Sequence, residues 1–335
     1  DIYSVDGKLL FAAGELVATS PETGADGYTY FDCDIPIRGE YYGSSIRKDA
    51  TTNSGNYIVK ELRAPLGYYV NEEPMEVTFT YDGQAIMVLD NTCSNKPTEM
   101  WVSKRDLTND EELPGATLAI KDMDGNIVTT WVSTDEPHRV TGLHFGESYT
   151  LTEIRAADGY ALADNITFRL IQKTDEGGNP LEECEVYYLT TKNILFWKWD
   201  DWRLLDDATV IMRDDITKVQ ISKKDLTTKE ELPGAELTLT DEKGNEIDRW
   251  VSTDAPHYME RLPAGKYTLT EVTAPDGYAI AERMEFEVLP NGEVQTFEMF
   301  DDTIKVKISK VDITTNEELP GAELVIKDKD GTEID

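Results

Sequence analysis

Residues 219–239 read VQISKKDLTTKEELPGAELTL, and the first part of this stretch alternates between apolar and polar side chains. Alternate residues of a β-strand point to opposite faces, so Val219, Ile221 and Lys223 share one face. The two aliphatic side chains mark that face as the core, where an unpaired lysine is rarely found. The stretch recurs twice, each time with its own inward lysine: 102–120 with Lys104, and 306–326 with Lys310. A lysine that is placed inward three times needs a buried partner.

Two further markers recur in a constant order along the chain. One is a Tyr-x-x-x-Glu strand that leads into a Gly-Tyr turn, as in YTLTEVTAPDGY at 267–278. The other is a strand that ends in an acidic pair or Asp-Asn, as in FEMFDD at 297–302. Parity assigns to the core face the glutamates Glu61, Glu153 and Glu271 and the aspartates Asp90, Asp214 and Asp301. Each complete repeat therefore directs one Lys, one Glu and one Asp into its own core.

The spacing of the markers divides the chain into repeats. Lys104 precedes Glu153 by 49 residues and Lys223 precedes Glu271 by 48, so two repeats share one plan. We predict a repeat without its first strand at 1–97, complete repeats at 98–216 and 217–303, and the start of a further repeat at 304–335. The second repeat carries an insert at 172–208. The joints are short, which predicts a semi-rigid, elongated rod.

Most of the chain predicts short β-strands. Segments such as ATLAIKD and MEFEVLP alternate over a few residues and are bounded by turn signals. The turn DMDGN at 122–126 is interpreted as a hairpin, because the twelfth position from Asp122 is Ser133 and not the Glu of a calcium loop. Outside the insert, no segment has a helical stripe. The expected fold class is all-β, with one β-sandwich per repeat.

Composition excludes several classes of partner. The chain has 32 basic and 66 acidic residues and a formal net charge of −34, which disfavours nucleic acid and anionic membrane. No apolar run of about 18 residues is present, so we expect no direct membrane insertion. Neither a signal peptide nor a sorting motif is found, as expected of an excised fragment. His138 and His257 lie in matching segments, which indicates a packing or turn role, and we expect no metal site and no cofactor.

The three cysteines form no C-x-x-C motif, which excludes a zinc knuckle or a thioredoxin-like site. Two interpretations remain open. Cys33 and Cys93 pair as a disulfide and leave Cys184 over, or all three are incidental free thiols.

A buried Lys, Glu and Asp can be accommodated in two ways. One is a salt-bridge cluster, and the other is an amide between the amine and a carboxyl, which removes two charges. Apolar surroundings lower the pKa of an amine and raise that of a carboxyl, so a nucleophile and an electrophile are produced together. The glutamate can transfer protons between them. Fixed neighbours supply the effective molarity that this condensation needs.

The segments SKKDLTTKEELPGAEL, YTLTEVTAPDGY and FEMFDD together resemble the CnaB-type (SpaA-like, prealbumin-like) domain of Gram-positive surface adhesins and pilin shafts. The resemblance covers nearly all of the chain outside the insert. It implies tandem inverse immunoglobulin-like β-sandwiches, each with a spontaneous isopeptide bond. It also implies an extracellular location on the bacterial surface, anchored to the cell wall through a region outside this fragment. The chain has Ala157-Asp158 where the third repeat has Pro275-Asp276, which weakens a turn and leaves the triad intact.

By motif match, the isopeptide bonds join Lys104 to Asp214 and Lys223 to Asp301, with Glu153 and Glu271 as proton shuttles. Many members of the family use Asn as the acceptor, whereas Asp occupies all three assigned positions here, so bond formation would release water. The unpaired members of incomplete triads are Glu61, Asp90 and Lys310.

Two functions are compatible with these features. The first is a structural stalk whose partners are other repeats of the same surface protein. The alternative is a ligand-binding adhesin that contacts a host protein or glycan through the 38–55 loop or through Trp197, Trp199 and Trp202 of the insert. We favour a hairpin whose aromatic residues cover a neighbouring repeat. A turnover enzyme is not expected, because each triad reacts once with itself.

Overall fold

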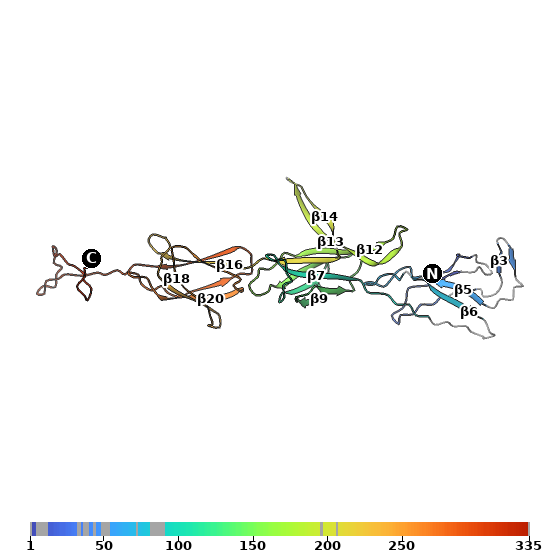
Figure 1. The fold of residues 1–335 in the computed structure, drawn as a ribbon, viewed down its shortest axis with the longest axis horizontal. Coiled ribbons are helices and arrows are strands. Elements are labelled where there is room, and N and C mark those ends of the chain that lie inside the picture. The colour runs from blue at the N-terminus through green and yellow to red at the C-terminus, as the bar shows by residue number, and fades with distance from the viewer. Residues whose placement is uncertain are drawn as a thin grey trace. The chain divides into compact units, whose positions relative to one another are not determined.

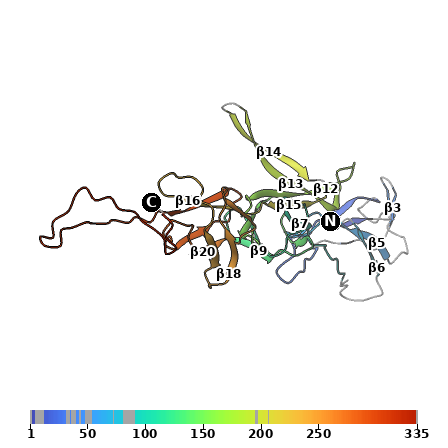
Figure 2. The same ribbon diagram turned by 60° about the vertical axis from the view of Figure 1, so that its left-hand side comes forward.

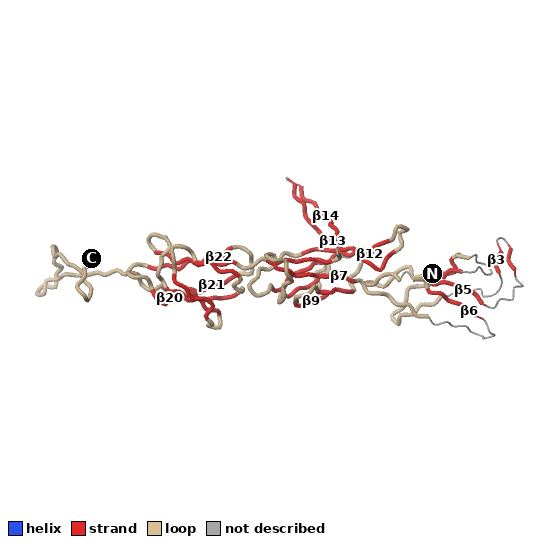
Figure 3. Tube along the Cα trace, in the orientation of Figure 1, coloured by secondary structure: helices blue, strands red, loops and turns tan. Residues whose placement is uncertain are grey.

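A computed structural model shows an all-β protein, and every regular element of the described residues is a strand (Figure 3). The structure describes residues 2–4, 13–31, 35, 40–42, 45–47, 54–71, 73–80, 91–194, 197–205 and 207–333. Within these ranges, no helix is long and apolar enough to cross a membrane. The all-β fold class predicted from the alternating segments is therefore confirmed.

The chain forms two compact units, which are described separately. The first contains residues 1–217 together with two short loops, 261–263 and 290–292. The second contains the remaining parts of 218–335.

The repeat at 98–216 is a sandwich of two sheets within the first unit (Figure 1). The smaller sheet has the order β10 (His138–Thr141), β7 (Glu99–Asp106) and β15 (Thr209–Asp214). The larger has the order β14 (Trp197–Leu205), β13 (Pro180–Ile194), β12 (Ile166–Thr174), β11 (Ser148–Arg155), β8 (Thr117–Lys121) and β9 (Ile127–Val132). The first strand, β7, runs parallel to the last, β15. Apolar side chains of alternate positions in both sheets, such as Met100, Leu151 and Phe168, fill the core.

The second unit repeats this plan. Its smaller sheet has the order β19 (His257–Glu260), β16 (Lys218–Asp225) and β22 (Val294–Asp301). Its larger sheet has the order β18 (Glu246–Val251), β17 (Glu236–Asp241), β20 (Gly265–Thr273) and β21 (Met284–Val288). Again the first and last strands, β16 and β22, pair in parallel. The same markers thus produce the same topology in both complete repeats.

The insert of the second repeat widens its larger sheet by two strands. β13 is 15 residues long, pairs with β12, and then returns through β14. Figures 1 and 2 show the far end of this hairpin standing away from the sandwich. Near its start, Cys184 and Val186 contribute to the core, so the insert is part of the fold at one end.

The described residues of the first repeat form a four-stranded sheet with the order β2 (Leu16–Ala18), β1 (Ile2–Ser4), β5 (Ser54–Val59) and β6 (Met75–Thr80). A separate ribbon joins β3 (Glu40–Tyr42) to β4 (Ser45–Arg47). β1 pairs with β5 as β8 pairs with β11, and no strand among the described residues of this repeat takes the position of β7. Residues 304–333 form no strand, only isolated bridges, and most of their side chains are exposed.

Candidate functional site

Two buried triads of one lysine and two carboxylates are the main chemical feature of the molecule. In the first unit, Lys104 projects from β7, Asp214 from the neighbouring β15, and Glu153 from β11 of the facing sheet. The side chains of all three are at most 1% exposed. Lys104 Nζ donates a hydrogen bond to Asp214 Oδ1, and it lies 2.9 Å from Glu153 Oε1.

The second unit holds an equivalent triad. Lys223 on β16 donates a hydrogen bond to Asp301 on β22. The Nζ of this lysine lies 3.2 Å from Oε1 of Glu271 on β20. The structure therefore brings together both sets of three residues that the markers selected.

Strand register explains how each lysine reaches its aspartate. Lys104 pairs with Met212, and Asp214 is the next residue on the same face of β15. The lysine strand is also held from its other side, because Leu113 N–H donates to Lys104 O at 2.7 Å. The hydroxyl of Tyr160, from the Gly-Tyr turn, donates to Asp106 at 2.7 Å, as Tyr278 does to Asp225 at 2.6 Å. The Lys-x-Asp and Gly-Tyr motifs thus hold each other in place.

Each glutamate is oriented by a backbone amide. Glu153 Oε2 accepts from Ala163 N–H at 2.7 Å, and Glu271 Oε2 accepts from Ala281 N–H at 2.6 Å. The other oxygen, Oε1, faces the lysine without hydrogen-bond geometry. Oδ2 of Asp214 and of Asp301 is also buried without a partner among the described residues. Each triad therefore has two unsatisfied carboxylate oxygens.

The charges of a triad do not balance if all three groups are ionised. One ammonium cannot neutralise two carboxylates in an apolar core, so a proton is expected on one acid. Burial raises the pKa of Asp214 to about 7, although Lys104 opposes this shift. Burial likewise raises the pKa of Glu271. A carboxyl that is protonated near neutral pH and lies against an amine has the composition required for amide formation.

The first repeat holds part of a triad. Glu61 is half-buried, and its Oε2 accepts from Asn71 N–H at 2.6 Å and from Asn95 Nδ2 at 2.5 Å. Among the described residues, no lysine forms an ion pair with Glu61. Asp90 lies outside the described residues, and Lys310 is exposed.

The backbone register aligns Asn95, which the sequence analysis did not consider, with Asp214 and Asp301. In each repeat, the second residue after the glycine of the Gly-Tyr turn donates its N–H to a backbone carbonyl. That carbonyl belongs to the residue that directly follows Asn95, Asp214 or Asp301. These bonds are Tyr69 to Lys96, Ala161 to Asp215, and Ala279 to Asp302, at 2.8–3.0 Å. A sequence signal was available: Asn95, Asp214 and Asp301 each precede a lysine of the first marker by nine residues, whereas Asp90 precedes Lys104 by fourteen.

The tryptophans of the insert are not equivalent. Trp202 is half-buried, and the guanidinium carbon of Arg169 on β12 lies 4.2 Å from its ring centroid. Trp197 and Trp199 lie in the part of β14 for which only the backbone pairing is described. Most of the 38–55 loop lies outside the described residues. Trp202 thus contacts a residue of its own repeat, whereas the sequence analysis favoured aromatic residues that cover a neighbouring repeat.

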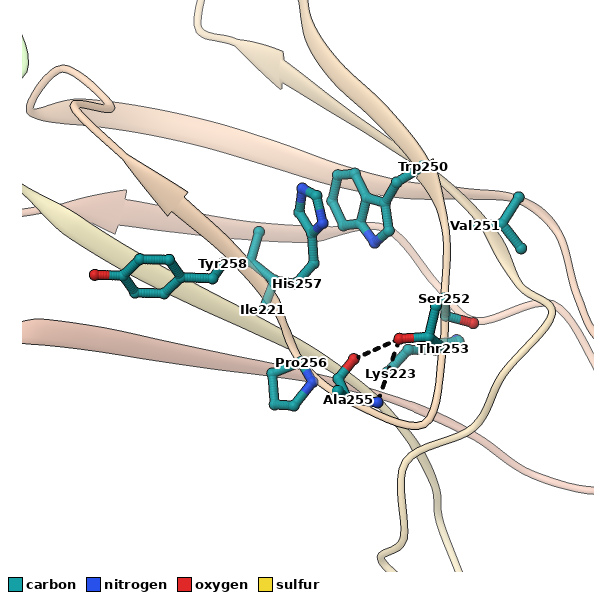
Figure 4. A pocket seen from close by; sticks show the side chains of 10 residues that line it. All are labelled: Ile221, Lys223, Trp250, Val251, Ser252, Thr253, Ala255, Pro256, His257 and Tyr258. Carbon is teal, nitrogen blue, oxygen red and sulfur yellow. Dashed lines mark hydrogen bonds between the residues drawn. The ribbon is translucent and has the colours of Figure 1, made fainter.

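The histidines pack as expected from their matching segments. His138 stacks on Trp131 and His257 on Trp250, with ring centroids 4.3 and 4.2 Å apart. A cavity of about 110 Å³ beside His257 reaches Lys223 (Figure 4). Within the described part of the chain, no cluster of residues is suited to hold a metal ion.

Two of the cysteines are free thiols: Cys93 is exposed and Cys184 is buried. Cys33 lies outside the described residues.

Comparison with known proteins identifies one family. A family model described as SpaA, prealbumin-like fold domain, matches residues 98–177 and 217–303. These are the two segments that begin at a complete lysine strand, and the second match ends just after Asp301. A search of curated proteins gives no match.

Solved structures with a similar fold are more distant. The Bacillus anthracis TIE protein is 22% identical over 87% of this chain, with a TM-score of 0.38, and the match spans about half (49%) of that protein. The shaft pilin SpaA of Lactobacillus rhamnosus GG is 13% identical over 63% of this chain and 99% of its own, with a TM-score of 0.25. A C-terminal fragment of the pilus adhesin SpaC of the same organism is 16% identical over the same shares, with a TM-score of 0.34. None of these matches is close enough for a comparison of individual residues.

Proposed function

The two matched segments are SpaA-type prealbumin-like domains, and from this premise we propose that the chain is a load-bearing segment of a bacterial cell-surface stalk. Amides between Lys104 and Asp214 and between Lys223 and Asp301 would stiffen it. The observation that carries this proposal is the contact of each buried lysine with an aspartate on the adjacent parallel strand, beside a buried glutamate. Its partners would be other repeats and subunits of the same surface structure.

The proposed reaction is a condensation that occurs once. The amine of Lys223 attacks Cγ of Asp301, and a C–N bond forms as a C–O bond breaks. The leaving oxygen departs as water with the proton of the acid and one from the amine. Glu271, whose Oε1 faces the amine, carries the amine proton to the leaving group. The product has no charge, so the burial that disfavours the reactants favours the amide. The triad is consumed and does not turn over.

The strand order gives the amide a mechanical role. β7 and β15 are the first and last strands of their sandwich and pair in parallel, so tension along the chain pulls these neighbours in opposite directions. An amide between Lys104 and Asp214 transmits that tension directly from one strand to the other. The 109 residues between them then cannot extend.

Intact-protein mass tests the proposal. We expect the purified chain to be lighter than its sequence by two waters, about 36 Da, and its digest to contain two branched peptides. Lys223→Ala should reduce the difference between the calculated and the measured mass by about 18 Da. Lys224→Ala should leave that difference unchanged, because Lys224 is only partly buried and pairs with Glu298 instead. A mass equal to that of the sequence would contradict the proposal.

A further inference from the structure

The insert of the second repeat places an arginine between two aromatic rings on the outer face of the larger sheet. Arg169 on β12 alternates with the core residues Phe168 and Leu170, so its side chain lies on the face turned away from the core. Its guanidinium carbon lies 4.2 Å from the ring centroid of Trp202 and 5.9 Å from that of Tyr187. The three neighbouring strands β12, β13 and β14, labelled in Figure 1, thus contribute one side chain each.

The charge of Arg169 is not neutralised by the chain itself. Among the described residues, no carboxylate forms an ion pair with its guanidinium, although the chain has 66 acidic residues. Glu185, which shares this face of the sheet, accepts a hydrogen bond from the hydroxyl of Tyr187 at 2.7 Å instead. Nε of Arg169 is buried without a hydrogen-bond partner. A partly buried cation without a counter-ion is unfavourable, and an anion from outside the chain would remove that cost.

The second unit shows that this arginine accompanies the hairpin. Phe168 on β12 and Phe286 on β21 each pair with the tyrosine of the Tyr-x-x-x-Glu strand, so the two strands are equivalent. The residue after the phenylalanine is Arg169 in the first unit and Glu287, which is exposed, in the second. The larger sheet of the second unit ends at β21. The cation is therefore found where β13 and β14 extend the sheet, and the sandwich itself does not require it.

Apolar surface surrounds the guanidinium. Leu204 lies on the same face of β14 as Trp202 and is 49% exposed. Leu189 on β13 pairs with Trp202 and is half-buried. The planar guanidinium matches the two oxygens of a carboxylate, and the rings and aliphatic side chains suit a flat face of C–H groups. A pyranose that carries a carboxylate has both features, whereas an acidic side chain of a peptide would leave the apolar surface unused.

We propose that Arg169, Tyr187, Trp202 and Leu204 form a binding site for an acidic saccharide, that is, a sugar with a carboxylate, such as a uronic or a sialic acid. The guanidinium binds the carboxylate, and the sugar ring packs on the aromatic rings and on Leu204. The net charge of −34 opposes the approach of any anion, so binding comes from these direct contacts. The site is separate from the triads and does not depend on the amides proposed above.

Pairs of sugars that differ in the carboxylate test the site in the full chain. Methyl glucuronide and methyl glucoside share one ring, and 3′-sialyllactose is lactose with an added sialic acid. We expect saturation-transfer NMR signals from the acidic member of at least one pair and none from the neutral members. The two pairs distinguish a uronic from a sialic acid. Binding of neither acidic sugar would overturn the proposal, as would equal binding of acidic and neutral sugars. A glutamate peptide that competes as well as the acidic sugar would overturn the saccharide assignment.

Substitutions then assign the binding to the arginine. Arg169→Gln should weaken it roughly ten- to hundredfold, because hydrogen bonds to a charged partner are lost. Arg169→Lys keeps the charge without the planar fork and should weaken it too. Arg203→Gln is the matched control and should leave binding unchanged, because Arg203 is exposed on the opposite face of β14.

A second control adds the arginine without the hairpin. Glu287→Arg places the cation at the equivalent position of the second unit, where no β13 and β14 supply rings, and should create no additional binding. Urea unfolding of every variant reports whether the fold is retained. Binding that survives Arg169→Gln in a folded chain, or that is lost in Arg203→Gln, would overturn the site.

Discussion

Glu271→Gln is the substitution that best isolates the contribution of an internal amide. A carboxamide has the shape of the carboxylate and can still accept from Ala281 N–H, but it cannot carry a proton. We expect Lys223 and Asp301 to remain in contact without reacting. The variant should therefore lose the crosslink while most of the packing of the second unit is retained.

The magnitude follows from the length of the closed loop. Lys223 and Asp301 are 78 positions apart, and a crosslink of this span lowers the entropy of the unfolded chain by an amount equivalent to about 4.5 kcal/mol. For a domain of this size, such a change lowers the melting temperature by roughly 20–30 °C. The amide also removes two buried charges, so the measured loss should be no smaller.

Calorimetry and intact mass together test this expectation. The transition of the second unit should move down, while that of the first, which retains Lys104 and Asp214, should stay in place. Two results would refute the reasoning. One is a Glu271→Gln chain that still lacks two waters. The other is a chain that has lost the crosslink but is destabilised by less than about 1 kcal/mol, far below the entropy estimate.

Three other measurements test the structure. The raised pKa of Asp214 means that it is protonated below about pH 7, so the rate of amide formation in freshly refolded chain should fall as pH rises through 7. Intact mass follows this rate, and a rate that rises over this range contradicts the role of Asp214 as the acid. In urea unfolding, Gly67→Ala should destabilise the first unit by several kcal/mol, because a Cβ there would lie 2.5 Å from a backbone oxygen. Gly125→Ala, which has a similar positive φ but open space around it, should cost about 1 kcal/mol. Trp202→Ala should lower the free energy of unfolding by about 2 kcal/mol through lost stacking on an arginine, whereas Leu204→Ala should lower it by under about 0.5 kcal/mol, because Leu204 is 49% exposed. Equal effects of the two substitutions would mean that Trp202 is not a packing residue.

Strand parity alone placed Lys104, Glu153 and Asp214 on core faces, because a period of two is a local property of the backbone. The repetition of the three markers likewise predicted an all-β chain, since each marker contains its own alternation and turn residues. These conclusions needed no knowledge of which strands are neighbours.

The tertiary structure decided which residue of the first repeat aligns with the aspartates of the complete triads. Parity selected Asp90 in the first repeat, and Asn95 was not considered. The bond from Tyr69 N–H to Lys96 O shows that Asn95 is the residue aligned with Asp214. The partner of Trp202 was also beyond the sequence, because Arg169 lies 33 residues away and is brought to it by the pairing of β12, β13 and β14. Register between strands depends on packing and hydrogen bonds across the sheet, which no single strand contains.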